Sequence, residues 1–292
     1  MFEMMLGTST VTSFVGKQVV LAPPGVNQKV PVVGFSSVQV SADTGIYFCL
    51  GNDIDGTPVR NLWYYQFTSN QWFDLGAVPT AMVGVYGTMG YIDNKLYWVC
   101  DELVFSYAET TQLWTRHKDI VTATLRGYGQ TSFVWNGELY VYGEVRTGSG
   151  VYLKKYTPST DTWFAVSTSP VTRNIYGNGV VVGDIAYFFS GVTRNRMVTY
   201  NLLTKIWRVV DLTWTMASFP VVVYNDGYIY ISTGAANGDV QRYEISSDTF
   251  APLPKLQNQR SQSGGGFYDG KMYIWGGSSS GLNQRTMLTY QL

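Results

Sequence analysis

The sequence predicts an all-β fold built from six similar units, and three observations carry this prediction. A segment of four short β-type runs, separated by tight-turn residues, recurs every 43 to 50 residues along the 292-residue chain. Tyrosine and tryptophan columns stay in phase through these segments. The last segment lacks its fourth run, while a spare apolar run precedes the first. Four-stranded units at this period are typical of propeller blades, so we expect a six-bladed β-propeller of antiparallel blades.

The clearest copy of the unit is GGGFYDGKMYIWGG, residues 264–277. It reads as a strand, an Asp269-Gly270 turn, a second strand and a Gly-Gly exit. An Asp-Gly pair between such strands favours a type I′ hairpin, because both central positions need a positive φ. Aligning the second run of all units gives one anchor tyrosine per blade: Tyr47, Tyr97, Tyr140, Tyr187, Tyr230 and Tyr273.

Two further aromatic columns follow the anchor tyrosines. The third run of each unit carries Tyr65, Tyr107, Tyr156, Tyr200, Tyr243 or Tyr290. Seven residues after the first five of these stand Trp72, Trp114, Trp163, Trp207 and Phe250. The pattern resembles the Kelch repeat, in which glycines after the second strand are followed by Tyr and Trp at fixed spacing. The resemblance covers about residues 30–292, although the double glycine is complete only at Gly276-Gly277.

The ends of the chain predict how the ring closes. The sixth unit stops at Tyr290-Gln291-Leu292, where its fourth strand would begin, and the apolar run SFVGKQVVLA occupies residues 13–22. We expect this N-terminal run to complete the sixth blade, because closure removes the exposed edges of an open array. The prediction is one propeller domain over residues 13–292. Residues 1–12 would form an N-terminal arm or tail, through which the domain could join a larger assembly.

Composition excludes several functional classes. The 20 basic residues balance 20 acidic ones without a Lys/Arg-rich run, so we expect no nucleic-acid partner. No signal peptide or membrane-spanning stretch is recognisable, so we expect no membrane insertion and favour a virion or cytoplasmic location. His117 is the only histidine, which excludes multi-histidine metal sites within one chain, and we expect no cofactor. Cys49 and Cys100 should be separate buried thiols, because their offsets from the anchor tyrosines place them on opposite strand faces.

Binding is expected on the face where the second-to-third-strand loops and the blade-to-blade loops meet. We call it the long-loop face; its second-to-third-strand loops span residues 52–61, 101–102, 144–150, 192–196, 235–239 and 278–285. Loops on a rigid scaffold commonly carry function. Arginines recur there, and guanidinium groups around a pocket suit carboxylate or phosphate ligands. The candidate ligand-binding residues are Arg126, Arg146, Arg173, Arg194, Arg196, Trp214, Arg260 and Arg285.

Each candidate has a plainer alternative. Arg126, Arg173 and Arg260 precede inner strands at matching offsets, so they could instead bond loop carbonyls as part of the repeat. Trp214 is the best candidate for an exposed stacking surface. Asp53 and Asp55 resemble a fragment of a calcium loop, but the later ligands are missing and an Asp-Gly turn is the simpler reading.

Enzymatic signatures are weak in this sequence. A Ser-His-Asp triad would have to use His117, which lies in a blade-to-blade loop without a GxSxG motif. Carboxylate pairs from separate blades leave glycosidase chemistry open. We therefore expect no catalytic residues to be identifiable from spacing alone.

Three functions remain open. The Kelch resemblance implies a non-enzymatic module that binds a protein or a glycan, including an intracellular protein-interaction module. A resemblance to single-domain Kelch enzymes, with arginine and acid side chains in a central pocket, would instead imply a sugar-modifying isomerase or lyase. Few charges and the lack of an Asn-x-Ser/Thr site favour a structural or receptor-binding component of a phage or viral particle, such as a tail fibre. We expect a binding or assembly module.

Overall fold

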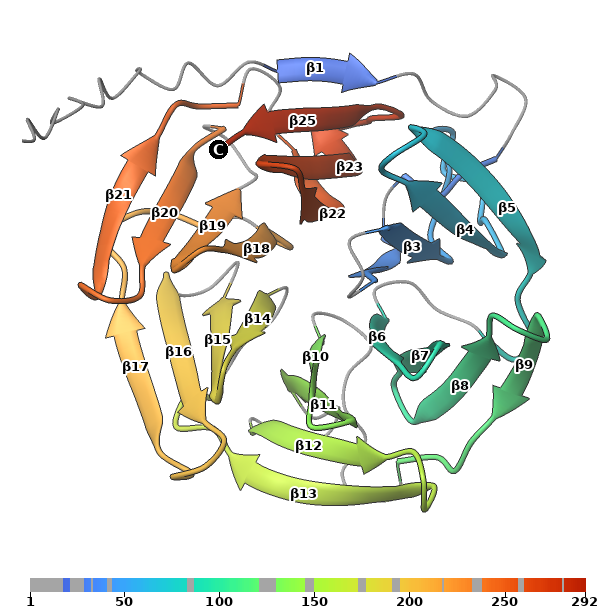
Figure 1. Ribbon diagram of the computed structural model, residues 1–292, viewed down its shortest axis with the longest axis horizontal. Coiled ribbons are helices and arrows are strands. Elements are labelled where there is room, and N and C mark those ends of the chain that lie inside the picture. Colours follow the sequence, from blue (N-terminus) through green and yellow to red (C-terminus); the bar gives the residue numbers. More distant parts are fainter. Residues whose placement is uncertain are drawn as a thin grey trace, which may run out of the picture.

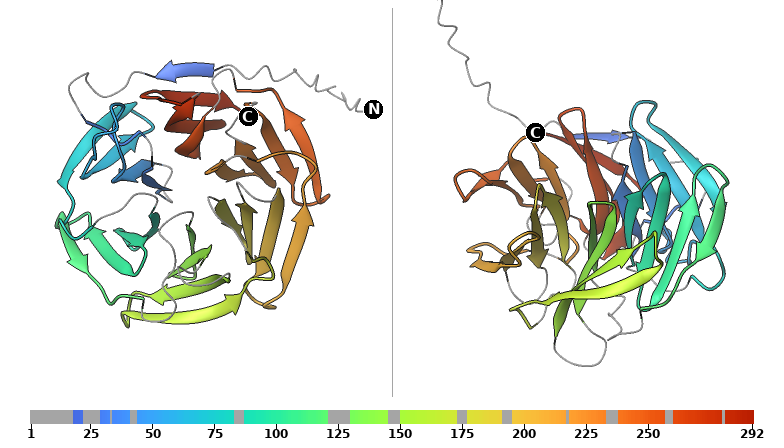
Figure 2. Two further views of the ribbon diagram at one scale, coloured as in Figure 1. Left: turned by 180° about the vertical axis from the view of Figure 1, so that it is seen from behind. Right: turned by 60° about the horizontal axis from the view of Figure 1, so that its bottom comes forward.

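Six antiparallel sheets surround a central axis in the computed structural model (Figure 1). The structure describes residues 18–21, 29–32, 34–40, 44–82, 87–120, 130–144, 150–172, 177–190, 195–216, 218–232, 238–256, 260–279 and 281–292. Throughout these ranges the regular elements are strands, without a helix. The ring is complete from behind as well (Figure 2). The predicted six-bladed all-β fold is confirmed.

Blades one to five each run from an inner strand at the axis to an outer strand at the rim. Blades one and two contain β2 (Ser36–Gln39), β3 (Gly45–Cys49), β4 (Asn61–Gln66), β5 (Gln71–Ala77), β6 (Thr88–Ile92), β7 (Lys95–Cys100), β8 (Leu103–Ala108) and β9 (Leu113–Arg116). Blades three and four contain β10 (Thr131–Trp135), β11 (Glu138–Glu144), β12 (Val151–Thr157), β13 (Thr162–Thr168), β14 (Asn178–Val182), β15 (Ile185–Ser190), β16 (Arg196–Asn201) and β17 (Trp207–Asp211). Blade five contains β18 (Val221–Asn225), β19 (Tyr228–Ser232), β20 (Val240–Glu244) and β21 (Thr249–Leu253).

The sixth blade joins both ends of the chain. Its strands are β22 (Ser261–Tyr268), β23 (Lys271–Ser279), the short β24 (Leu282–Asn283), β25 (Met287–Gln291) and β1 (Gln18–Leu21). The N-terminal β1 pairs antiparallel with β25 and lies outside it at the rim (Figures 1 and 2). The predicted closure by an N-terminal strand is therefore confirmed, with β1 at Gln18–Leu21 as the described part of the apolar run. The predicted arm at residues 1–12 lies outside the described residues.

The turn chemistry works as the sequence indicates. Asp269 and Gly270 have φ values of 47° and 70°, which is the backbone of a type I′ turn. The equivalent turn of blade five, at Asp226 and Gly227, has φ values of 43° and 83°. Tight hairpins thus separate the inner and second strands at the face opposite the long loops.

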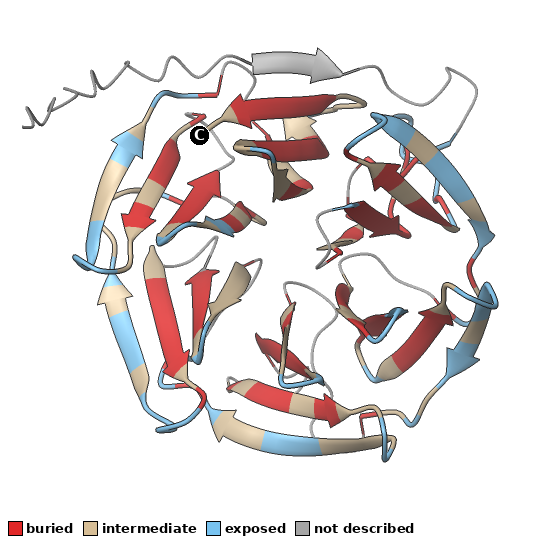
Figure 3. Cartoon of the chain, in the orientation of Figure 1, coloured by how far each residue is buried: buried red, intermediate tan, exposed pale blue. Residues whose placement is uncertain are grey.

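The seven-residue Tyr-Trp spacing is a cross-strand pair around the turn between the third and outer strands. Tyr200 lies directly opposite Trp207, and their ring centroids are 4.4 Å apart. The hydroxyl of this tyrosine column also caps the turn in three blades. Tyr156, for example, donates to Asp161 at 2.7 Å. In blades one to five the aromatic pairs therefore pack the outer strand against the third strand. The burial colours show that the middle strands are largely buried and the outer strands largely intermediate or exposed (Figure 3).

Cys49 and Cys100 are buried free thiols, as predicted, but the reasoning that separated them was wrong. Both lie in one hydrophobic cluster between blades one and two. One face of blade one packs against the opposite face of blade two. A residue on the first face and a residue on the second therefore lie in the same hydrophobic cluster between the blades. Burial raises the pKa of the Cys100 thiol to about 12, so it remains protonated at neutral pH.

Candidate functional site

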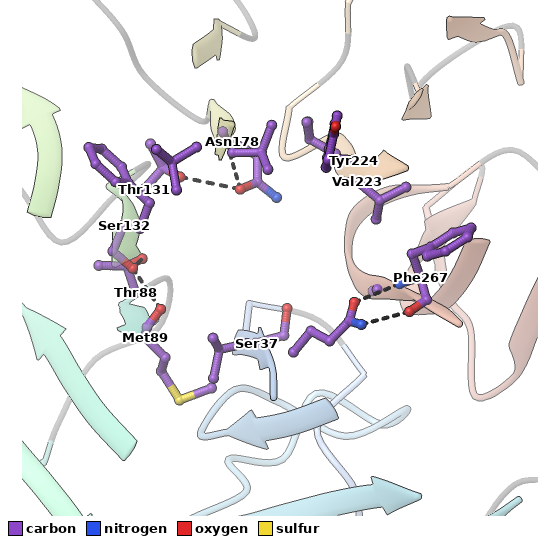
Figure 4. A pocket seen from close by; sticks show the side chains of 18 residues that line it. Ser37, Thr88, Met89, Thr131, Ser132, Asn178, Val223, Tyr224 and Phe267 are labelled. Atoms are coloured by element: carbon purple, nitrogen blue, oxygen red, sulfur yellow. Dashed lines mark hydrogen bonds between the residues drawn. The ribbon is translucent and has the colours of Figure 1, made fainter. Parts of the chain in front are cut away.

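The axis of the ring holds a cavity of about 330 Å³ lined by all six inner strands. Figure 4 shows its 18 lining side chains, which are aliphatic, aromatic, hydroxyl or amide groups, or glycines. No carboxylate, imidazole, ammonium or guanidinium group is among these described residues, and Tyr224 is the one titratable side chain of the 18. The axial cavity therefore offers hydrogen bonds, apolar contacts and a single phenol.

Most polar groups of this cavity already connect neighbouring blades (Figure 4). The hydroxyls of Thr88 and Ser132 lie 2.6 Å apart between blades two and three. Thr131 donates to the Asn178 side chain at 3.3 Å, and the amide of Asn178 donates to the Pro220 carbonyl at 3.0 Å. These bonds connect blades two to five around the axis. Their first role is to hold the ring together.

The strongest of these fasteners spans the seam between blades one and six. The Gln39 amide donates to the Phe267 carbonyl at 2.6 Å, and its oxygen accepts the Phe267 N–H at 2.7 Å. Gly266 permits this approach, because a Cβ there would lie 2.5 Å from the Gln39 oxygen. The glycines that open the clearest repeat thus allow close contact between the first and last blades.

On the long-loop face, the same seam carries a rigid loop at residues 52–60. The Asp53 carboxylate accepts the N–H groups of Asp55 at 3.0 Å and Thr57 at 2.9 Å, and Asp53 is buried. Such bonds from an aspartate to its own loop form an Asx-type turn. Since no group of three potential metal-ligating residues occurs in the described part of the chain, this turn is the role that the geometry gives Asp53.

The loop is braced against blade six. The side-chain amide of Asn283 lies 3.3 Å from the carbonyl oxygens of both Asp53 and Ile54. Two large apolar side chains next to this brace face solvent: Ile54 is 46% exposed and Leu282 is 69% exposed. Sequence reasoning missed this pair; the signal was an isoleucine between two aspartates, Asp53 and Asp55.

Arg260 occupies a structural position. It is 2% exposed and donates to the carbonyl oxygens of Gly276 at 3.2 Å and Thr286 at 2.6 Å, and to the Thr286 hydroxyl. Burial without a counter-ion lowers the pKa of Arg260 to about 10. These bonds fit the scaffold alternative, in which the arginine bonds loop carbonyls of its own repeat.

The other predicted ligand-binding residues are dispersed. Arg196 begins β16 and pairs with Asp211 at 2.5 Å, while Arg285 is half-buried beyond β24. Trp214 is also half-buried and packs edge-on against Phe250, with ring centroids 5.8 Å apart. The remaining four lie outside the described residues: Arg126, Arg146, Arg173 and Arg194.

His117 lies in a hydrogen-bonded chain between blades two and three. Its Nε2 is 2.7 Å from the Ser106 hydroxyl, and its Nδ1 is 3.5 Å from Asp161. This order of groups matches a Ser-His-Asp triad, but the serine is buried while the aspartate is the more accessible group. Ser106 is 4% exposed, whereas the Asp161 side chain is 37% exposed. A nucleophile must reach its substrate, and Ser106 is buried. The hydrogen bonds of His117 therefore connect blades two and three.

Comparisons with known proteins bear on the fold alone. No protein-family model and no curated protein matches this sequence. Among solved structures, YjhT is similar over 90% of this chain and 96% of its own, with a TM-score of 0.71 and 13% sequence identity. The structure and this likeness define the chain as a β-propeller. In the described residues, no helix is long and apolar enough to cross a membrane.

Proposed function

We propose that this propeller is a non-enzymatic recognition module that binds a protein partner on the long-loop face, at the seam of blades one and six. The observation that carries the proposal is the exposed pair Ile54 and Leu282, held on loops that Asn283 ties together. Apolar side chains on a preorganised surface lose little conformational entropy when a partner covers them. The fully buried core of a protein interface is more apolar than its rim, and exposed aliphatic side chains suit such a core.

The axial cavity argues for binding over catalysis. A sugar isomerase or lyase would need acid and base groups near the reacting atoms, and the 18 lining residues hold a single titratable side chain, the phenol of Tyr224. A glycan could still use the hydroxyl and amide groups there. However, those groups are engaged between blades, so a sugar would compete with contacts that hold the ring.

The setting that we propose is an assembly such as a phage or viral particle. Its support is compositional: low charge, abundant small polar residues and two cysteines. A tail fibre or attachment protein would use the recognition face outward and join the particle elsewhere.

The test compares the double variant Ile54→Asp/Leu282→Asp with the wild type and with Leu113→Asp. Leu113 is a matched control, because it is 66% exposed and lies on an outer strand away from the seam. Partners captured by the immobilised propeller are compared by mass spectrometry, and a glycan array and a sugar-turnover screen run in parallel. We expect a protein partner that the seam variant loses and the control keeps. Equal capture by all three proteins, or sugar turnover, would refute the proposal.

A further inference from the structure

A second cavity of about 330 Å³ opens beside the same loop, on blade one. It is lined by Lys29, Pro58, Val59, Arg60, Asn61, Trp63 and Asp74. Arg60 ends the loop that carries Ile54, and Lys29 lies in the segment that leads into blade one. The cavity therefore belongs to the long-loop end of β4 and lies apart from the axis.

Two cationic side chains of the cavity have no partner in the described part of the chain. Lys29 and Arg60 are exposed, and within the described chain neither side chain forms an ion pair or a hydrogen bond. Trp63 is 1% exposed, and its indole Nε1 is buried without a hydrogen-bond partner. The indole N–H groups of Trp72 and Trp163 are buried without a partner as well, so the two cations carry the argument and Trp63 serves as a reporter beside them.

The acceptor in the cavity is already engaged. Both carboxylate oxygens of Asp74 accept the Asn61 amide, at 2.9 Å and 2.8 Å, and one of them also accepts the Gly76 N–H at 2.9 Å. Two cationic side chains thus stand beside a single, hydrogen-bonded carboxylate. The balance leaves one positive charge and several free donors.

We infer that this cavity binds a carboxylate group, supplied by an acidic side chain of the protein partner. The inference rests on the proposed function, because Ile54 and Arg60 belong to one loop and would meet the same partner. Arginine matches the two oxygens of a carboxylate, and lysine adds a point charge. One net positive charge suits a monovalent carboxylate better than a phosphate, which carries nearly two negative charges. The apolar anchor would then give affinity, and the cationic cavity would select the acidic partner.

The indole N–H signal of Trp63 provides a direct readout. It is assigned with Trp63→Phe and followed by ¹H–¹⁵N NMR while acetate, or a short peptide with one glutamate, is titrated at constant ionic strength. Chloride and phosphate are the comparison ions. We expect acetate and the peptide to shift the signal in a saturable way. Lys29→Met/Arg60→Met should weaken binding roughly 10- to 100-fold, as for loss of charged hydrogen bonds. Arg116→Met, which removes an exposed arginine of β9, should leave it unchanged.

The outcomes separate this inference from the proposed function. A saturable shift in Ile54→Asp/Leu282→Asp shows a working carboxylate site even if no partner is found. No saturable shift, an equal shift with chloride, or tighter binding of phosphate than of acetate overturns the inference. Tighter binding of the glutamate peptide than of acetate identifies a peptide side chain as the source. Tighter binding of acetate overturns that part.

Discussion

Gln39 should make a measurable contribution to the seam between blades one and six, beside the other contacts that cross it. Its amide makes two hydrogen bonds with the backbone of Phe267, across 228 positions of sequence. Gln39→Met keeps the length of the side chain and removes both bonds. The perturbation therefore tests polar fastening at the point where the first and last blades meet.

The expected loss of stability follows from those two bonds. Each intramolecular hydrogen bond contributes about 1 kcal/mol net, and an N–H or C=O left buried without a partner costs about 1–3 kcal/mol more. Since Gln39 is half-buried, water can reach part of the exposed backbone. We expect the free energy of unfolding to fall by about 2–4 kcal/mol, which would lower Tm by roughly 3–7 °C for a domain of this size.

Urea unfolding followed by tryptophan fluorescence measures this change, with Gln71→Met as the control. Gln71 is exposed on β5, so its replacement adds the same side chain without removing a seam bond. A lower midpoint with an unchanged m-value is the expected result. Loss of less than about 0.5 kcal/mol, or an equal loss in the control, would show that the seam does not depend on Gln39.

Two further results are expected. Burial lowers the pKa of His117 below its usual 6.5, so the folded state resists protonation. The contribution of His117 to stability should be fully present above pH 6.5 and should be lost as the pH falls through the folded pKa. Urea midpoints at several pH values should therefore depend less on pH for His117→Gln than for the wild type. If the wild type and His117→Gln show the same pH dependence, His117 does not titrate as described. Asp53→Ala should release the Asp55 and Thr57 amides and speed their hydrogen exchange without unfolding the propeller, whereas unchanged exchange would show that the loop at residues 52–60 is held by other contacts.

Sequence reasoning worked best where the signal was local or repeated. Turn residues predicted the hairpins, because Asp-Gly and Asn-Gly tolerate the positive φ that a type I′ turn requires. The Tyr-Trp interval predicted a repeating unit, because it is the length of chain that brings two aromatic rings together around one turn. Even the missing strand could be predicted, since a ring with five complete blades and one incomplete blade must find its last edge within the chain.

The candidate site was much less predictable. Counting arginines along the loops gave Arg196 and Arg260 similar weight, yet one is paired on a strand and the other is buried under loop carbonyls. The cavity on blade one was not anticipated, because Lys29, Arg60 and Asp74 are far apart in sequence and belong to no repeat column.

By itself, the sequence determined the number of blades, the strand order within each blade and the closure of the ring. These features depend on turn conformation and on the alternation of side chains along a strand, which are properties of neighbouring residues. Only the tertiary structure decided which polar groups remain free. The axial hydroxyls of Thr88, Thr131 and Ser132 are engaged across blade boundaries, whereas the Trp63 indole N–H has no partner in the described chain. Whether a polar group is free depends on which group of the neighbouring blade lies within hydrogen-bond distance of it. That distance cannot be read from the spacing of residues along the sequence.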